Sequence, residues 1–204
     1  MQKSSILTFK TNLYSMEPLL RYIHSITPFS EESWIQLQPA LSKRIFKKKD
    51  FLLKEDQICN SLFFIENGYC RSYYERDGLE KNTAFFFEND IATNLRSFGS
   101  GQKSEASIIA CEPLVAIILD KDKLFEAAKR LPEIEVLGRN CIRLFASRQE
   151  EFSVLFNIYS AEERLSYIEN KYPQLLQRVS QTQLASFLGI ARETLSRIRK
   201  RRIL

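Results

Sequence analysis

The segment Gln181–Lys200, QTQLASFLGIARETLSRIRK, constrains the possible fold more than any other part of the chain. Ser180 precedes it and is a common N-cap residue. Gly189 lies mid-segment, where a tight turn between helices needs a positive φ that glycine adopts without a Cβ clash. Apolar residues recur at helical spacing on both sides of this glycine: Leu184, Ala185, Leu188, Leu195 and Ile198. The pattern predicts a helix-turn-helix, with Ala185 small enough for close packing.

The outer face of the second helix carries polar residues within about 140° of arc. These residues are Arg192, Glu193, Ser196, Arg197 and Lys200. Arginine can donate twice to guanine O6 and N7, and glutamate can accept from cytosine N4. An ordinary helical hairpin with a solvated charged face is the alternative interpretation. The agreement of the glycine, the small residue and the apolar positions favours a helix that enters the DNA major groove.

Positive charge is concentrated in the same region. Residues 178–204 contain seven basic residues and one acidic residue, a net charge of +6, whereas the whole chain carries +5. The remainder of the chain is therefore nearly neutral. Such a distribution is typical of a segment that binds a polyanion. A solubilising basic tail would not explain the periodic apolar residues among the charges.

The sequence ARETLSRI resembles the recognition helix of the Crp/Fnr bacterial transcription regulators. The resemblance implies base contacts by Arg192, Glu193 and Arg197 and a phosphate contact by Thr194. It also makes RNA polymerase a candidate partner. The printed chain ends at Leu204, so we expect no winged hairpin after the second helix. The phosphate contacts of such a hairpin would then come from other basic residues: Arg199, Arg201 and Arg202.

The N-terminal part predicts helices followed by short strands. Residues 16–43 have helical character, with Ser30 as a cap. Between Ile45 and Leu119 the sequence pattern becomes that of short strands. Asn67-Gly68 and Asp77-Gly78 are hairpin signals. Many short antiparallel strands favour a small barrel or roll. We therefore expect an α+β protein, and the resemblance implies an N-terminal effector-sensing β-roll, a jelly-roll-like double-stranded β-helix.

A long helix is expected from about residue 133 to 159, after a shorter one capped by Asp120. It has two apolar stripes: Ile134, Leu137, Cys141 and Leu144 in one, and Ile142, Phe145, Phe152, Phe156 and Tyr159 in the other. One stripe could cover the roll and the other a second subunit, as the resemblance implies; a single wide face inside one domain is the alternative. Ser160 would cap a helix to Lys171, and residues 174–179 would link it to the helix-turn-helix. The predicted domains are 1–132 (roll), 133–159 (dimerisation helix) and 160–204 (DNA-binding domain).

In cyclic-nucleotide-binding members of the resembling family, a Gly-Glu pair and a later Arg-Ser pair hold ribose and phosphate. Thr93-Asn94 and Ser104-Glu105 stand at these positions here, so both charged anchors are absent and cyclic AMP is not the expected effector. Arg96 and Lys103 could bind a different anion, although solvated loop charges are the preferred interpretation. A filled core or an apolar ligand is the remaining possibility, the latter among aromatic residues: Phe63, Phe85 and Phe87.

Other function classes find little support in the sequence. The chain has one histidine, four cysteines without a CxxC pair, no GxSxG and no P-loop, so we expect no enzyme, metal or cofactor. No signal-peptide core or membrane-length apolar run is present, so we expect a cytoplasmic protein. The leading hypothesis is a homodimeric regulator of palindromic DNA sites. The alternative is a ligand-sensing module whose C-terminal helices bind a protein. Operator, effector and direction of regulation are not encoded in any recognisable pattern.

Overall fold

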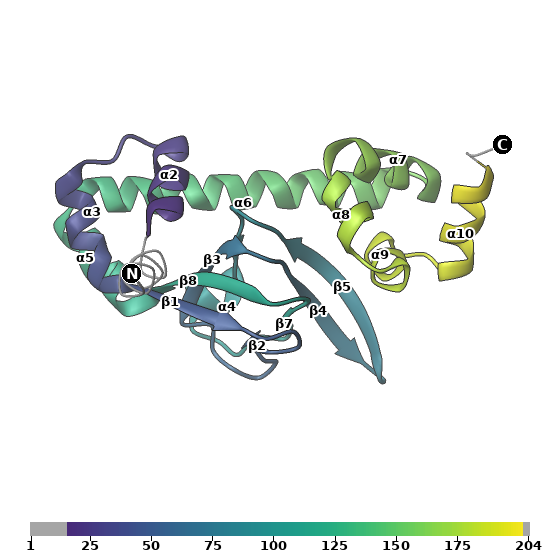
Figure 1. Ribbon diagram of the computed structural model, residues 1–204, viewed down its shortest axis with the longest axis horizontal. Helices are drawn as coiled ribbons and strands as arrows, with labels where there is room; N and C mark the ends of the chain where they lie inside the picture. The colour runs from purple at the N-terminus through teal and green to yellow at the C-terminus, as the bar shows by residue number, and fades with distance from the viewer. Residues whose placement is uncertain (1–15, 202–204) are drawn as a thin grey trace, which may run out of the picture. The chain divides into compact units, whose positions relative to one another are not determined.

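The computed structural model describes residues 16–201 and contains two four-stranded sheets, with helices both before and after them in the chain (Figure 1). One sheet has the strand order β1-β8-β3-β6 and the other β2-β7-β4-β5. The strands are β1 Leu41–Phe46, β2 Phe51–Leu53, β3 Ser61–Asn67, β4 Cys70–Arg76, β5 Leu79–Phe86, β6 Ile91–Ala92, β7 Ser107–Ala110 and β8 Leu114–Asp120. The pairings β1–β8, β3–β8, β3–β6 and β2–β7 are antiparallel, as expected for a roll.

The helices precede and follow the sheets. They are α2 Glu17–Ile26, α3 Glu31–Leu37, the 3-10 turn η1 Gln38–Ala40, α4 Leu95–Ser100, α5 Lys121–Arg130, α6 Pro132–Ile158, α7 Ala161–Lys171, α8 Pro173–Arg178, α9 Gln181–Leu188 and α10 Arg192–Arg201. The predicted caps Ser30, Asp120 and Ser160 are confirmed, since each side-chain oxygen accepts an N–H bond three residues on. The α+β prediction is also confirmed.

Two element predictions are wrong. The helical character assigned to residues 16–43 ends early: Pro39 lies in η1, and β1 begins at Leu41 because its residues pair with β8. The supposed linker at 174–179 is largely helical, since Pro173 occupies the first turn of α8, where its missing N–H is not needed. The second error arises because Pro173 was taken only as a stop signal for the preceding helix.

The hairpin predicted at Asn67-Gly68 is also wrong. β3 and β4 flank this turn but belong to different sheets, so the turn carries the chain from one sheet to the other. Gly68 has φ +85°, and a Cβ there would lie 2.5 Å from the Pro113 carbonyl oxygen. The glycine is therefore required by a close backbone approach as well as by its φ. By contrast, Asp77-Gly78 joins the neighbouring strands β4 and β5, with positive φ at both residues, as predicted.

The apolar side chains of α6 do not separate into the two predicted stripes. Ile134 and Leu137 of the first stripe are buried, but Leu144 is 51% exposed. In the second stripe Phe152 and Phe156 pack against Phe187, so these residues serve an intramolecular core. The stripes were drawn from helical spacing, which does not show which neighbours each face meets. Large apolar side chains remain exposed on and just after α6: Ile142, Leu144, Val154, Ile158 and Tyr159.

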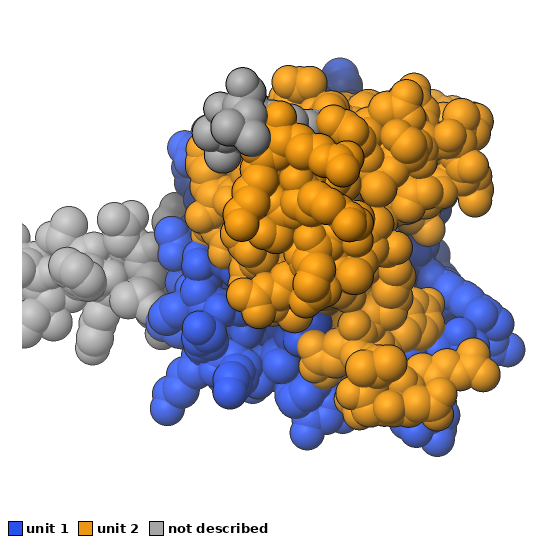
Figure 2. Space-filling view, turned by 90° about the vertical axis from the view of Figure 1, so that its right-hand side faces the viewer, with its two compact units in different colours: residues 1–71, 86–142 blue, residues 72–85, 143–204 orange. Residues whose placement is uncertain are grey.

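The chain divides into two compact units (Figure 2). The first contains the residues up to 71 together with 86–142, and the second contains 72–85 together with 143–204. Nearly all of the β4–β5 hairpin thus belongs with the C-terminal helices. The three domains predicted from the sequence stay a prediction. Within residues 16–201, no helix has both the length and the apolar character needed to cross a membrane.

Candidate nucleic-acid interface

Helix α9 and the turn after it have the predicted local structure. The Ser180 hydroxyl accepts from the Gln183 N–H at 3.3 Å, which caps the helix N-terminus. Gly189 ends the helix with φ +72°, and the Ile190 N–H donates back to the Ala185 carbonyl at 3.1 Å. This is the hydrogen-bond pattern of a Schellman ending. It turns the chain sharply before α10, as a helix-turn-helix requires.

Helix α10 has one buried face and one charged face. Leu195 and Ile198 are buried, as predicted. The opposite side borders an open groove of about 520 Å³ between α9 and α10. Its lining consists of Gln181, Arg192, Glu193, Ser196, Arg197, Lys200 and Arg201. The groove therefore presents several cations, one carboxylate and neutral hydrogen-bonding groups together.

The remaining predicted DNA-contact residues lie beside this groove or beyond the described residues. The half-buried Thr194 hydroxyl accepts from Arg197 Nη2 at 3.4 Å, which draws the arginine toward the start of α10. Arg199 is half-buried and does not line the groove. Arg202 lies outside the described residues. Of the predicted set, Arg192, Glu193 and Arg197 are exposed and line the groove.

Arg164 of α7 connects the end of α6 to the turn of the motif. Its Nε donates to the Tyr159 carbonyl at 2.9 Å and its Nη2 to the Phe156 carbonyl at 2.8 Å. Its Nη1 donates to the Leu188 carbonyl at 3.1 Å. The carbonyls at a helix C-terminus lack partners within the helix and carry partial negative charge, so a guanidinium suits them. One side chain thus holds two helix ends in a fixed relation.

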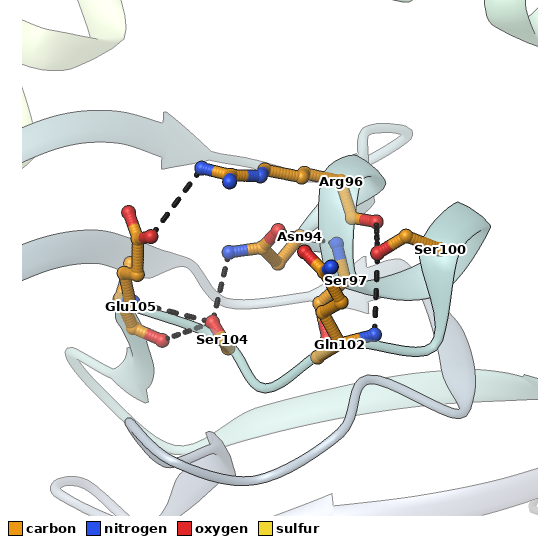
Figure 3. A network of polar contacts seen from close by, with 8 residues as sticks. Asn94, Arg96, Ser97, Ser100, Gln102, Ser104 and Glu105 are labelled. Atoms are coloured by element: carbon orange, nitrogen blue, oxygen red, sulfur yellow. Dashed lines mark hydrogen bonds and ion pairs between the residues drawn. The ribbon is translucent and has the colours of Figure 1, made fainter.

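The segment that corresponds to the nucleotide cassette is closed by its own hydrogen bonds (Figure 3). Asn94 caps α4 by accepting from the Ser97 N–H at 3.0 Å, and its Nδ2 donates to the Ser104 hydroxyl at 2.8 Å. The Ser104 hydroxyl, which is buried, in turn donates to the Ala106 carbonyl at 2.6 Å. The Ser97 hydroxyl donates to the Gln102 carbonyl. Asn94 and Ser104 therefore hold this loop together.

The two cations of this segment are paired on the surface. Arg96 Nη1 lies 3.3 Å from a carboxylate oxygen of Glu105, as Figure 3 shows, and Lys103 Nζ lies 3.9 Å from one of Asp56. All four side chains are largely exposed. Exposed pairs of this kind contribute little free energy. The preferred interpretation of Arg96 and Lys103 as solvated loop charges fits this geometry.

Comparison with known proteins agrees with this architecture. Residues 43–130 match the family model of the cyclic nucleotide-binding domain. The chain has the fold of the Crp/Fnr regulators. A search of curated protein sequences gave no match.

Three solved structures illustrate this likeness. The catabolite activator protein of Thermus thermophilus has 19% identity and a TM-score of 0.55, covering 85% of this chain and 83% of that chain. FixK2 of Bradyrhizobium japonicum has 19% identity and a TM-score of 0.66, covering 79% and 83%. A protein from Eubacterium rectale, described as a transcriptional regulator of the Crp/Fnr family, has 14% identity and a TM-score of 0.63, covering 83% and 82%. At these identities the comparison shows the fold.

Within the Crp/Fnr fold, the three aromatic residues proposed for an apolar effector site have separate neighbours. Phe63 of β3 packs edge-on to Phe46 at 6.4 Å between ring centroids, and Phe87 stacks on Tyr69 at 5.2 Å. Phe85 packs against Phe187 of α9 at 5.5 Å. Each ring thus has an aromatic partner in the protein. Of the two alternatives, a filled core and an apolar ligand, this arrangement favours the filled core.

The cysteines of this Crp/Fnr-fold chain behave as packing residues. Cys59 and Cys70 are buried, and Cys111 and Cys141 are half-buried. Burial raises the pKa of the Cys141 thiol to about 11 and, as the largest cause, that of Cys111 to about 11. Thiols with such pKa values are poor nucleophiles and poor metal ligands at neutral pH. Among residues 16–201 no cluster of three potential metal ligands occurs.

Sequence reasoning missed two residues that support the Crp/Fnr-fold helix-turn-helix. Arg164 was included only within the helix predicted to end at Lys171, and Asn82 was not singled out. Asn82 is 3% exposed although its neighbours Lys81 and Thr83 are exposed. A polar residue at an inward-facing strand position is the one signal that could have drawn attention to it. Its partners lie about one hundred residues further along the chain.

Proposed function

We propose that the protein is a sequence-specific DNA-binding transcription regulator that binds palindromic sites as a homodimer. The observation that carries the proposal is the exposed groove beside α10, where Arg192, Glu193 and Arg197 lie opposite the buried Leu195 and Ile198. Arginine and glutamate side chains on one helical face can read guanine and cytosine. The positive charge of the segment supplies the sequence-independent attraction to phosphate.

The homodimer is supported by the surface of α6. Exposed large apolar side chains on one long helix are costly unless a partner covers them. Two-fold pairing through α6 would give two identical DNA-reading helices, and two such helices recognise half-sites related by the same symmetry. The similarity of this fold to that of the Crp/Fnr regulators also supports a homodimer.

The effector is proposed to be something other than cyclic AMP. The cassette offers Asn94 and Ser104 where charged anchors would be needed, and these two residues bond to each other. Regulation without any roll ligand fits the paired aromatic residues equally well. No catalytic constellation is part of the proposal, in keeping with a regulator rather than an enzyme.

Selection of bound sequences from a random duplex pool tests this function. We expect enrichment of a palindrome, and an affinity that falls linearly with the logarithm of salt concentration. The alternative is a module that binds a protein partner. It would be favoured if no sequence were enriched and if the full chain bound a protein stably through residues 143–204. A preferred sequence without two-fold symmetry would retain DNA binding but contradict the homodimer.

A further inference from the structure

The β4–β5 hairpin is hydrogen-bonded to helix α9. The Asn82 backbone N–H donates to the Ser186 hydroxyl at 3.1 Å, and Asn82 Nδ2 donates to the Gln183 carbonyl at 3.1 Å. The Ser186 hydroxyl donates to the Glu80 carbonyl at 2.9 Å. Glu80 and Asn82 are two apart on β5, so their backbone N–H and C=O groups point to the same edge of the strand. The Ser186 hydroxyl therefore makes two hydrogen bonds with this strand: it accepts one from the Asn82 N–H and donates one to the Glu80 carbonyl.

An apolar contact lies next to these hydrogen bonds. Phe85 of β5 meets Phe187 of α9 edge-to-face, with 5.5 Å between ring centroids. Phe187 is buried and also contacts Phe152 and Phe156 of α6 at 5.6 and 5.5 Å. Arg148 of α6 donates to the Phe85 carbonyl at 3.4 Å. Residues 72–85 thus pack into the same compact unit as α9 and α10, which Figure 2 shows in one colour.

The hairpin holds α9 without covering the charged groove. No residue of 72–85 is among the groove's lining residues, and Arg192, Glu193 and Arg197 are exposed. The hairpin contacts instead Gln183, Ser186 and Phe187 of α9. Because α9 leads through Gly189 into α10, a fixed α9 also fixes the direction in which α10 presents its polar face. The contact therefore supports α9 and leaves the charged groove beside α10 open.

We propose that Asn82 and Ser186 are positioning residues for DNA binding, and that the β4–β5 hairpin is the arm that holds the helix-turn-helix in its DNA-reading orientation. This inference rests on the proposed function. The arm is built from strands that begin and end in the roll, since Cys70, Arg71 and Phe86 of β4 and β5 belong to the first unit. A change in the conformation of these strands would reach α9 directly.

The test uses the full chain and the variants Ser186→Ala and Asn82→Ala. Ser166→Ala is the matched control, because the Ser166 hydroxyl donates to the Glu162 carbonyl within its own helix α7. Ser186→Ala loses two hydrogen bonds to β5 and should lower affinity for the preferred duplex about tenfold, whereas Asn82→Ala loses one bond to the Gln183 carbonyl and should lower it less. Affinity for random duplex and the salt slope should stay unchanged, because no phosphate contact is removed. Ser186→Ala binding the preferred duplex as tightly as Ser166→Ala would overturn the inference.

A measurement without DNA separates this inference from the proposed function. The backbone amide proton of Asn82 should exchange slowly in the wild type. In Ser186→Ala it should exchange much faster, because the hydroxyl that accepts its hydrogen bond is removed. Rapid Asn82 exchange in the wild type would overturn the hairpin contact even if DNA binding were normal. If the wild type bound no duplex at any salt concentration, the proposed function would fall, and the positioning role with it. Slow Asn82 exchange would then still report the hairpin contact as present.

Discussion

At the scale of single residues, the two kinds of arginine in the C-terminal segment should behave differently. Replacing Arg197 by Ala should cost about 1–3 kcal/mol on the preferred site and relax base preference there, because a base-edge contact is lost. Replacing Arg201 by Ala should weaken all duplexes alike and lower the salt slope by about one unit. Fluorescence anisotropy with preferred and random duplexes over a salt series measures both effects. Equal losses on both duplexes for both variants would contradict the assignment.

At the scale of elements, Arg164 should stabilise the helical C-terminal part strongly. Arg164→Ala removes three charge-assisted hydrogen bonds to helix-end carbonyls, so the free energy of unfolding should fall by about 2 kcal/mol or more. Arg164→Lys should restore little, because one ammonium group cannot reproduce the planar fork that reaches three carbonyls. Denaturant-induced unfolding of the full chain measures these changes.

Arg139→Ala is the control for Arg164. Arg139 is exposed on α6 and pairs with Glu135 one turn away, and pairs of this kind contribute less than about 1 kcal/mol. The unfolding midpoint of Arg139→Ala should stay near that of the wild type. Indistinguishable curves for Arg164→Ala and Arg139→Ala would show that Arg164 does not connect α6 and α9 energetically.

At the scale of the whole molecule, α6 should form the dimer interface. Ile142 on α6 and Ile35 on α3 are each 55% exposed, which makes them a matched pair. Ile142→Lys should dissociate the dimer because it places a charge in an apolar interface, whereas Ile35→Lys should leave it intact. Sedimentation at micromolar concentration distinguishes the two. A monomeric wild type, or dissociation by both substitutions, would count against an interface on α6.

The effector response also belongs to the whole molecule. Titration calorimetry with cyclic AMP and cyclic GMP should give no heat of low-micromolar binding. The cassette residues Asn94 and Ser104 bond to each other, and Arg96 pairs with Glu105 at the surface. Losing two charge-assisted contacts should weaken a cyclic nucleotide by at least about a hundredfold. Low-micromolar affinity for either nucleotide would mean that the cassette was placed on the wrong residues.

Features that depend on residues close together in the chain could be predicted from the amino-acid sequence. The caps at Ser30, Asp120, Ser160 and Ser180 were predictable because a cap and its helix lie within a few residues. Leu184, Leu188, Leu195 and Ile198 were predicted as buried because helical periodicity places them on facing sides around the Gly189 turn. Asp77-Gly78 was predicted as a hairpin turn because its strands are adjacent in the chain. In each case local geometry and the tertiary structure favour the same conformation.

Features whose partners lie far apart in the chain became known only from the fold. Asn67-Gly68 carries the same local signal as Asp77-Gly78, yet β3 and β4 enter different sheets because β3 pairs with β8 and β6. Phe152 and Phe156 were predicted as part of an apolar stripe whose neighbour the sequence left open, and the fold brings Phe187 against them. The Asn82–Ser186 contact joins residues 104 positions apart. Such pairings depend on which elements the fold brings together, and periodicity along one helix or strand contains no information about the element opposite it.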